Sequence, residues 1–220
     1  MIRIAIVDDH RLFRICLRRM LEDIKGLQIV AEAESGEKAV EVARNLQPNV
    51  MLMDLSMPGI GGLEATKRIC RMDANVRVLV LSAYTEEPFP TQALSAGAHG
   101  YITKGVSGQE VYKAIRKIMM GGRYMSADVA QQLALRVFEN TTSCPFENLS
   151  GREMQITLMV VNCHKVLQIS NDLHLSPKTV NSYRYRIFEK LNVKSDVELT
   201  LLAVRHGMID PQVNGVSIAG

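Results

Sequence analysis

The chain contains 220 residues with a formal net charge of +3; 47% of its residues are hydrophobic and 22% are charged. This composition is typical of a globular protein with one large domain or two ordinary ones. It excludes a membrane-spanning helix, because no apolar run approaches the roughly 20 residues that such a helix needs. The first residues form a strand pattern and lack the features of a signal peptide, so we expect a cytoplasmic protein without a membrane partner.

Residues 1–121 alternate between short apolar runs and helical patterns. The runs predict strands at 2–7, 28–34, 50–54, 76–82 and 100–103, and the periodic segments predict helices at 10–23, 36–46, 61–71, 86–96 and 107–120. Pro88 is expected in the first turn of the fourth helix, where proline is tolerated. Five strands alternating with five helices predict an α/β fold, a doubly wound five-stranded parallel sheet with the flavodoxin-like order 2-1-3-4-5.

The reactive side chains of this region stand where predicted strands end. Right-handed crossovers bring the carboxyl ends of parallel strands to one edge, and that edge collects Asp8, Asp9, Asp54, Ser82 and Lys104. Three carboxylates repel one another, so a divalent cation such as Mg²⁺ is expected between them. Asp54 can then attack a phosphoryl group. The Ser82 hydroxyl and the Lys104 ammonium can hold the added oxygens.

These strand ends resemble the receiver domain of two-component response regulators. The similar motifs are Asp-Asp at 8–9, Met-Asp-Leu-Ser-Met-Pro-Gly at 53–59, Ser-Ala at 82–83 and Gly-Tyr-Ile-Thr-Lys at 100–104. The resemblance covers residues 1 to about 121. It implies that Asp54 accepts phosphate from a sensor histidine kinase, and that the only chemistry the domain catalyses is phosphoryl transfer to Asp54 and its later loss.

The resemblance also implies the roles of the neighbouring residues. Mg²⁺ is bound by Asp9, Asp54 and the main-chain oxygen of Ser56, with Asp8 helping. The Ser82 hydroxyl moves toward the phosphate, and Tyr101 changes its rotamer in concert. The residues alone predict less for Tyr101, which without the resemblance is an ordinary half-buried strand aromatic.

A linker and a second, all-α domain follow the receiver pattern. We expect a partly helical linker at 122–148, a four-helix domain at 149–209 and a tail at 210–220. The domain's helices begin at Ser150, near Val166, at Ser176-Pro177 and at Ser195. Short connections between the second and third helices are typical of a helix-turn-helix. Across the chain, three capping boxes are predicted, pairing Ser107 with Glu110, Ser150 with Glu153 and Ser195 with Glu198.

The third helix of this domain is basic. Residues 176–194 carry five basic side chains and one acidic side chain. The helical period leaves one set of residues for a partner, namely Lys178, Thr179, Asn181, Ser182, Tyr185 and Arg186, with Arg184 nearby. Asparagine suits adenine edges, and a helix N-terminus favours phosphate, so this set predicts DNA contacts. On charge alone, a solvated basic face of a bundle helix explains the pattern equally well.

The second half resembles the LuxR-type DNA-binding domain. The similar stretches are Leu-Ser-Gly-Arg-Glu at 149–153, Leu-Ser-Pro-Lys-Thr-Val-Asn-Ser-Tyr-Arg-Tyr-Arg-Ile at 175–187 and Lys-Leu-Asn at 190–192. A receiver followed by this domain is similar to the NarL/FixJ class, and several stretches are more similar still to the GacA/UvrY/LetA regulators. The resemblance implies a transcription factor that, once phosphorylated, binds promoter DNA as a homodimer and activates genes for small regulatory RNAs. Dimer contacts are predicted on the last helix at Val197, Leu201 and Val204.

One position departs from those regulators. Cys163 stands where they often have glycine, after the first helix of the second domain. A helix end of this kind needs a residue with a left-handed backbone. We expect Asn162 to supply it.

Two other functions fit parts of the sequence. The first is a phosphatase with an aspartyl nucleophile, of the haloacid dehalogenase type. Such enzymes carry a second aspartate two residues after the nucleophile, where this chain has Ser56. The second is a receiver that acts only through protein contacts, with the helical domain as an adaptor. The basic third helix argues against the adaptor, and a DNA titration with steep salt dependence separates the two.

Overall fold

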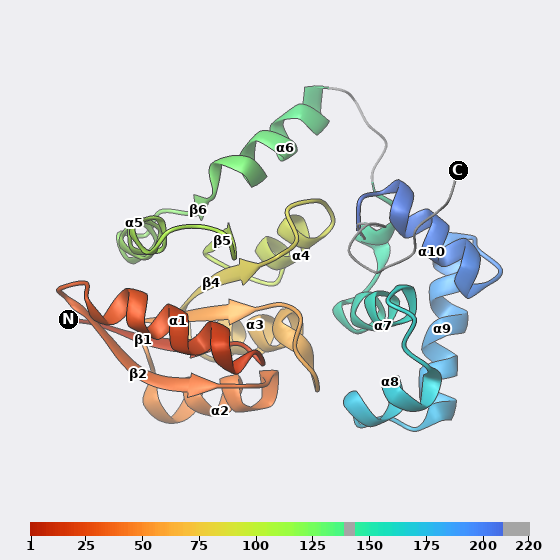
Figure 1. Ribbon diagram of the computed structural model, residues 1–220, viewed down its shortest axis with the longest axis horizontal. Helices are drawn as coiled ribbons and strands as arrows, with labels where there is room; N and C mark the ends of the chain where they lie inside the picture. Colours follow the sequence, from red (N-terminus) through yellow and green to blue (C-terminus); the bar gives the residue numbers. More distant parts are fainter. Residues whose placement is uncertain (139–143, 209–220) are drawn as a thin grey trace. The chain divides into compact units, whose positions relative to one another are not determined.

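The computed structural model describes residues 1–138 and 144–208, which form two compact units (Figure 1). Of the described residues, the first unit holds 1–85 and 89–138, and the second holds 86–88 and 144–208. Part of the predicted linker, 139–143, and the predicted tail at 210–220 lie outside the described residues. None of the described helices combines the length and the apolar character that crossing a membrane requires.

The first unit is built on a parallel sheet in the order β2-β1-β3-β4-β5-β6. Its strands are β1 (Ile2–Val7), β2 (Leu27–Ala33), β3 (Val50–Asp54), β4 (Arg77–Ser82), β5 (Gly100–Thr103) and β6 (Tyr124–Met125). The predicted strand order is confirmed. The predicted count of five was wrong, because Tyr124 and Ser126 donate backbone hydrogen bonds to His99 and Tyr101. The sheet thus continues past residue 121, where we had predicted its domain to end.

Helices connect the strands (Figure 1). They are α1 (Arg11–Glu22), α2 (Gly36–Leu46), α3 (Gly61–Met72), α4 (Phe89–Ser95), α5 (Gly108–Met119) and α6 (Ala127–Phe138). α4 begins later than predicted, so Pro88 precedes the helix, and Pro90 takes its second position, where a missing N–H breaks no helical hydrogen bond.

The core of the first unit lies between the sheet and its helices. All five residues of β3 are buried, as an apolar central strand of a parallel sheet requires. Alternate residues of β1, β3 and β4 share one hydrophobic cluster with α1 and α5. A strand buried on both faces fixes where its last residue lies. Asp54 therefore lies at the carboxyl edge of the sheet and is itself buried.

The second unit is all helical (Figure 1). It contains a 3₁₀ helix η1 (Pro145–Asn148), then α7 (Gly151–Val161), α8 (Val166–Asp172), α9 (Pro177–Leu191) and α10 (Asp196–Arg205). The four predicted helices are confirmed. Ser176 caps α9 by accepting a hydrogen bond from the Thr179 N–H, and Pro177 follows as the first helical residue.

The three predicted capping boxes form unequally. The box at Ser150 is complete, since the Glu153 carboxylate accepts from the Ser150 N–H. At Ser107 and Ser195 only the serine half forms. The remaining carboxylates bind elsewhere: Glu110 accepts from the Tyr124 hydroxyl, and Glu198 accepts from the Lys194 N–H. A tertiary contact diverts Glu110, whereas Glu198 binds the N–H one residue before its N-cap, so these two predicted boxes were wrong.

The turn after α7 also differs from expectation. Asn162 keeps an ordinary backbone with φ −85°, whereas Cys163 has φ +63°. The N–H groups of Cys163 and His164 donate to Val160 and Met159, which is the hydrogen-bond pattern of a Schellman motif. In that motif the residue after the C-cap is left-handed, and it is Cys163. The prediction for Asn162 was wrong by one residue.

Candidate functional site: an acidic pocket and a basic helix

The acidic pocket lies at the carboxyl ends of β1, β3 and β5. Asp8 and Asp54 are buried, with 1% and 2% of their surface exposed. The Lys104 Nζ lies 2.7 Å from Asp8 Oδ2 and 3.0 Å from Asp54 Oδ2. The lysine therefore bridges two carboxylates that belong to different strands, as the alignment of the strand ends predicted.

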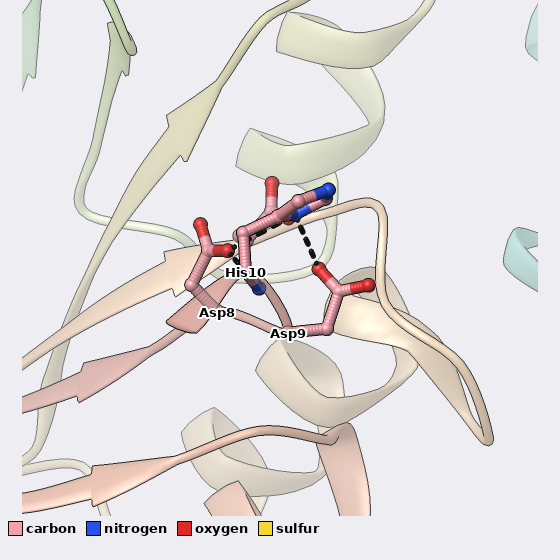
Figure 2. A group of neighbouring side chains, drawn as sticks. Asp8, Asp9 and His10 are labelled. Atoms are coloured by element: carbon pink, nitrogen blue, oxygen red, sulfur yellow. Dashed lines mark hydrogen bonds and ion pairs between the residues drawn. The ribbon is translucent and has the colours of Figure 1, made fainter. Parts of the chain in front are cut away.

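Asp9 and His10 form the outer part of the pocket (Figure 2). The His10 Nδ1 lies 2.9 Å from Asp9 Oδ1 and 3.4 Å from Asp8 Oδ1. Its backbone N–H donates to Asp8 Oδ1 at 2.8 Å. The sequence interpretation missed His10, although its place directly after two aspartates was a signal that could have identified it.

The pocket has the donor set for a divalent cation. One ligand atom from each of Asp8, Asp9, His10 and Asp54 lies within 4.8 Å of the others. The Lys104 Nζ lies against the buried Asp8 Oδ2 and Asp54 Oδ2, and the His10 Nδ1 lies against the buried Asp9 Oδ1. Carboxylate oxygens suit Mg²⁺, and the ion keeps several waters and needs only one or two protein carboxylates, which this set supplies. These residues fit the metal that the sequence predicted.

Burial dominates the electrostatics of Asp54. Removal from water raises the pKa of Asp54 to about 6, and the charge on Asp8 adds to the rise. Lys104 and the backbone N–H of Ser56 oppose it by stabilising the carboxylate. For Lys104, burial lowers the pKa, but the Asp54 and Asp8 charges outweigh it and raise the pKa above its usual value. At neutral pH the Asp54 carboxyl is therefore mostly ionised although it is poorly solvated.

Two neighbours fix the backbone around the pocket. A Cβ on Gly62 would stand 1.9 Å from the Asp54 carbonyl oxygen, so only glycine lets α3 approach the end of β3 this closely. Arg14 is buried and donates to the Asp8 carbonyl at 2.6 Å, while its Nε pairs with Glu32 at 3.2 Å. Arg14 was not predicted as a site residue, since its helical position resembled a solvated charge.

The predicted switch residues lie beside the pocket. Ser82 and Tyr101 are fully buried. The Ser82 Oγ accepts from the Tyr84 N–H at 3.1 Å, and the Tyr101 hydroxyl donates to the Tyr84 carbonyl at 2.6 Å. The backbone of Tyr84, which the sequence interpretation missed, thus binds both Ser82 and Tyr101. Its side chain stacks on Phe89 with ring centroids 4.2 Å apart, and it also forms a hydrogen bond with the side chain of Ser56.

The basic helix α9 presents most of the predicted DNA-contact residues at the surface of the second unit. Lys178, Ser182, Tyr185 and Arg186 are exposed, while Thr179 and Asn181 are half-buried. The Ser182 hydroxyl donates to the Lys178 carbonyl at 3.0 Å, and the Thr179 hydroxyl lies 2.8 Å from that of Ser176. The inward residues Val180, Ile187 and Leu191 are buried as predicted.

Arg184 differs from its neighbours. Only 22% of its side chain is exposed, and its Nη2 lies 2.5 Å from Asp196 Oδ2. Its Nη1 donates to Asn181 Oδ1 at 2.9 Å. The residue predicted as a nearby DNA contact is therefore already held by two partners within its own unit.

The last helix carries an uncovered apolar stripe. Val197, Leu201 and Val204, the predicted dimer contacts, are exposed on α10, whereas Leu199 and Ala203 are buried on its other side. Residues three and four apart lie on one helix face, so the three form a continuous strip.

Comparison with known proteins decides the family. The model of the response regulator receiver domain matches residues 4–116, and the model of bacterial regulatory proteins of the luxR family matches residues 147–203. The chain is a response regulator of the LuxR type. The first match extends from β1 into α5, and the second extends from η1 into α10.

Relatives match along nearly the full chain. The response regulator GacA of Pseudomonas aeruginosa is 56% identical over 211 residues, which cover 96% of this chain and 99% of that protein. The response regulator UvrY of Escherichia coli is 53% identical over 213 residues, covering 96% and 98%. The chain thus belongs to the same regulator family as GacA and UvrY.

A solved structure shares the fold. RcsB from Salmonella enterica serovar Typhimurium, bound to promoter rprA in the presence of the phosphomimetic BeF₃⁻, has a TM-score of 0.67 at 22% identity. The match covers 91% of this response regulator and 97% of the RcsB chain. At this identity the likeness concerns the fold.

Proposed function

We propose that a sensor histidine kinase phosphorylates Asp54, and that the phosphorylated regulator binds promoter DNA as a homodimer and activates transcription in the cytoplasm. The proposed targets are genes for small regulatory RNAs, which the resemblance of the sequence motifs to the GacA/UvrY/LetA regulators implies. The observation that carries the proposal is Asp54 itself, a buried carboxylate paired with Lys104 at a parallel strand end.

The chemistry is a transfer between two side chains. A carboxylate oxygen of Asp54 attacks the phosphorus of a kinase phosphohistidine. A P–O bond forms as the P–N bond breaks, and the imidazole takes the electron pair and a proton. The Lys104 ammonium then holds a phosphoryl oxygen, because it already lies within 3.0 Å of the Asp54 carboxylate. We propose no turnover of other substrates.

Mg²⁺ belongs to this proposal as a bound cofactor. Asp9, Asp54 and the Ser56 main-chain oxygen would hold it, with Asp8 contributing. When bound, it neutralises charge on the carboxylates and on the phosphoryl oxygens. His10 lies beside Asp9, with its Nδ1 2.9 Å from Asp9 Oδ1, and would restrain the orientation of that carboxylate.

Ser82 and Tyr101 would change their hydrogen bonds when Asp54 carries a phosphoryl group. The Ser82 hydroxyl is buried next to the pocket, and a rotation that lets its O–H donate to a phosphoryl oxygen would move Oγ away from the Tyr84 N–H. Tyr84 also accepts from the Tyr101 hydroxyl, so a shift of this backbone frees Tyr101 to rotate. A local charge is thus converted into a movement of the β4–α4 loop.

The second unit supplies the DNA contacts. Lys178, Thr179 and Arg186 are proposed to bind phosphates, and Asn181, Ser182 and Tyr185 to face base edges. The apolar strip Val197, Leu201 and Val204 would pair two copies, which lets the regulator read two half-sites. RcsB, which has the same fold, was solved on promoter DNA.

The test treats wild type, Asp54→Asn and the control Asp23→Asn with acetyl phosphate and Mg²⁺. Asp23 is an exposed aspartate at the end of α1, so the control makes the same chemical change outside the pocket. Wild type and control should gain one phosphoryl group by intact mass, form dimers by light scattering and bind a duplex pool more tightly. Equal phosphorylation of Asp54→Asn would overturn the site assignment. Phosphorylation without any DNA binding would favour the protein-contact adaptor instead.

A further inference from the structure

Arg184 is the most constrained cation on α9. Its guanidinium joins two residues, with Asp196 Oδ2 2.5 Å from Nη2 and Asn181 Oδ1 2.9 Å from Nη1. The guanidinium carbon, Cζ, also lies 5.7 Å from the centroid of the Phe188 ring. A guanidinium has a fixed planar fork of donors, so two acceptors and a ring restrain its orientation as well as its position.

Asp196 is the partner that holds it. This residue begins α10, where the helix dipole favours a carboxylate. About half of its side chain is exposed, but its Oδ1 is buried. The pair therefore links the recognition helix α9 to the helix that carries the proposed dimer strip. It also neutralises one of the five positive charges between residues 176 and 194.

The contact with Arg184 sets the orientation of the Asn181 side-chain amide. An asparagine amide has a carbonyl that accepts and an NH₂ that donates, and its two orientations present different groups to a base edge. Because Arg184 donates to Oδ1, the amide has one preferred orientation. The Nδ2 donors then remain for a partner outside the helix.

We propose that Arg184 and Asp196 are positioning residues for DNA specificity: they fix the amide of Asn181 and withhold one positive charge from the phosphates. Selectivity between sequences rises, while non-specific affinity falls. The inference rests on the proposed DNA binding by α9 and adds residues that do not themselves touch the bases.

The test compares Asp196→Asn with Glu189→Gln in the full chain, phosphorylated with acetyl phosphate and Mg²⁺. Glu189 is exposed on the same helix, so the control raises the charge equally without touching Arg184. Each protein is selected against a random 30-base-pair duplex library. Affinities are then measured for the duplex that wild type selects and for a scrambled duplex, from 50 to 300 mM salt.

Asp196→Asn should bind the scrambled duplex more tightly, with a salt slope steeper by about 0.9, the value for one added phosphate contact. Discrimination between the two duplexes should fall roughly tenfold, within the range of one bidentate base contact, and the base preference should relax at one position per half-site. Glu189→Gln should leave the discrimination ratio unchanged. Equal ratios in the two variants would overturn the inference.

A second comparison separates positioning from charge. In an Asn181→Ala background, Asp196→Asn should no longer alter the base preference, because the amide it controls is absent. An unchanged effect of Asp196→Asn in that background would overturn the inference. Failure of the proposed function has a different signature: phosphorylated wild type would bind neither duplex at 50 mM salt, and both proposals would then fall.

Discussion

The acidic pocket and the basic helix place charge under opposite physical conditions. In the pocket, Asp8 and Asp54 are buried, and their partner Lys104 arrives from a third strand. On α9, Lys178 and Arg186 are exposed and come from one continuous segment. Buried charges interact strongly and shift pKa values, whereas exposed charges are screened by salt. The pocket should therefore respond to pH and packing, and the helix to ionic strength.

The largest expected effect tests the packing around the pocket. Gly62→Ala places a Cβ against the Asp54 backbone, 1.9 Å from its carbonyl oxygen. We expect destabilisation of the first unit by about 3 kcal/mol and loss of phosphorylation, since α3 must move away from β3. Gly105→Ala is the control, because no atom lies within 4 Å of its Cβ position. Calorimetry and intact mass measure both effects; equal stabilities would refute the packing constraint.

The next effect tests burial of charge. The pKa of Asp54 is raised from 3.8 to about 6. Between these two pH values the folded first unit therefore keeps the Asp54 proton, which the unfolded chain has already released. Stability without metal should fall as pH rises from about 4 to about 6 and stay lower above that range. Asp54→Asn should remove this dependence and stabilise the unit by about 2 kcal/mol at pH 7.5.

The measurement for Asp54→Asn is thermal unfolding in EDTA at pH 4.5 and 7.5, with Asp23→Asn as the matched control. Millimolar Mg²⁺ should shrink the advantage of Asp54→Asn at pH 7.5, because the wild-type carboxylate then has a cation partner. An advantage that is the same at both pH values would contradict the role of Asp54 ionisation.

A smaller effect belongs to the second unit. Cys163→Gly should stabilise it by about 1 kcal/mol, because Cys163 has φ +63° in a motif that favours glycine. Cys16→Gly makes the same change at an exposed helical position in α1 and should destabilise the first unit. Calorimetric transitions of the two units report the opposite signs. Destabilisation by Cys163→Gly would show that contacts of the Cys163 side chain stabilise the unit by more than its left-handed backbone destabilises it.

The smallest effect tests the exposed helix. Lys178→Gln should weaken binding to every duplex a few-fold at low salt and reduce the salt slope by about 0.9. The difference in affinity between Lys178→Gln and wild type should vanish at high salt, because salt screens exposed charges. The buried charges of the pocket should not be screened in this way. Lys25→Gln, an exposed lysine of the first unit, is the control. Filter binding between 50 and 300 mM salt measures the affinity and its salt slope. A change in base preference would assign Lys178 to base contacts instead of phosphate contacts.

Much of the fold could be predicted because its signals are local. The all-apolar β3, the Ser176-Pro177 start of α9 and the alternation of strands and helices each depend on neighbouring residues. The sixth strand was missed because β6 has only two residues, Tyr124 and Met125, and its partner lies more than twenty residues earlier. No periodicity can be recognised in so short an element.

The candidate site divides in the same way. By itself the sequence determined which residues end the strands and which residues share a face of α9, because strand alternation and helical period follow from backbone geometry. Only the tertiary structure decided what those side chains contact. It brought Lys104 to both Asp8 and Asp54, turned Glu110 to Tyr124, and tied Arg184 to Asp196. A charged side chain selects its partner from everything within reach, and that set exists only once the chain has folded.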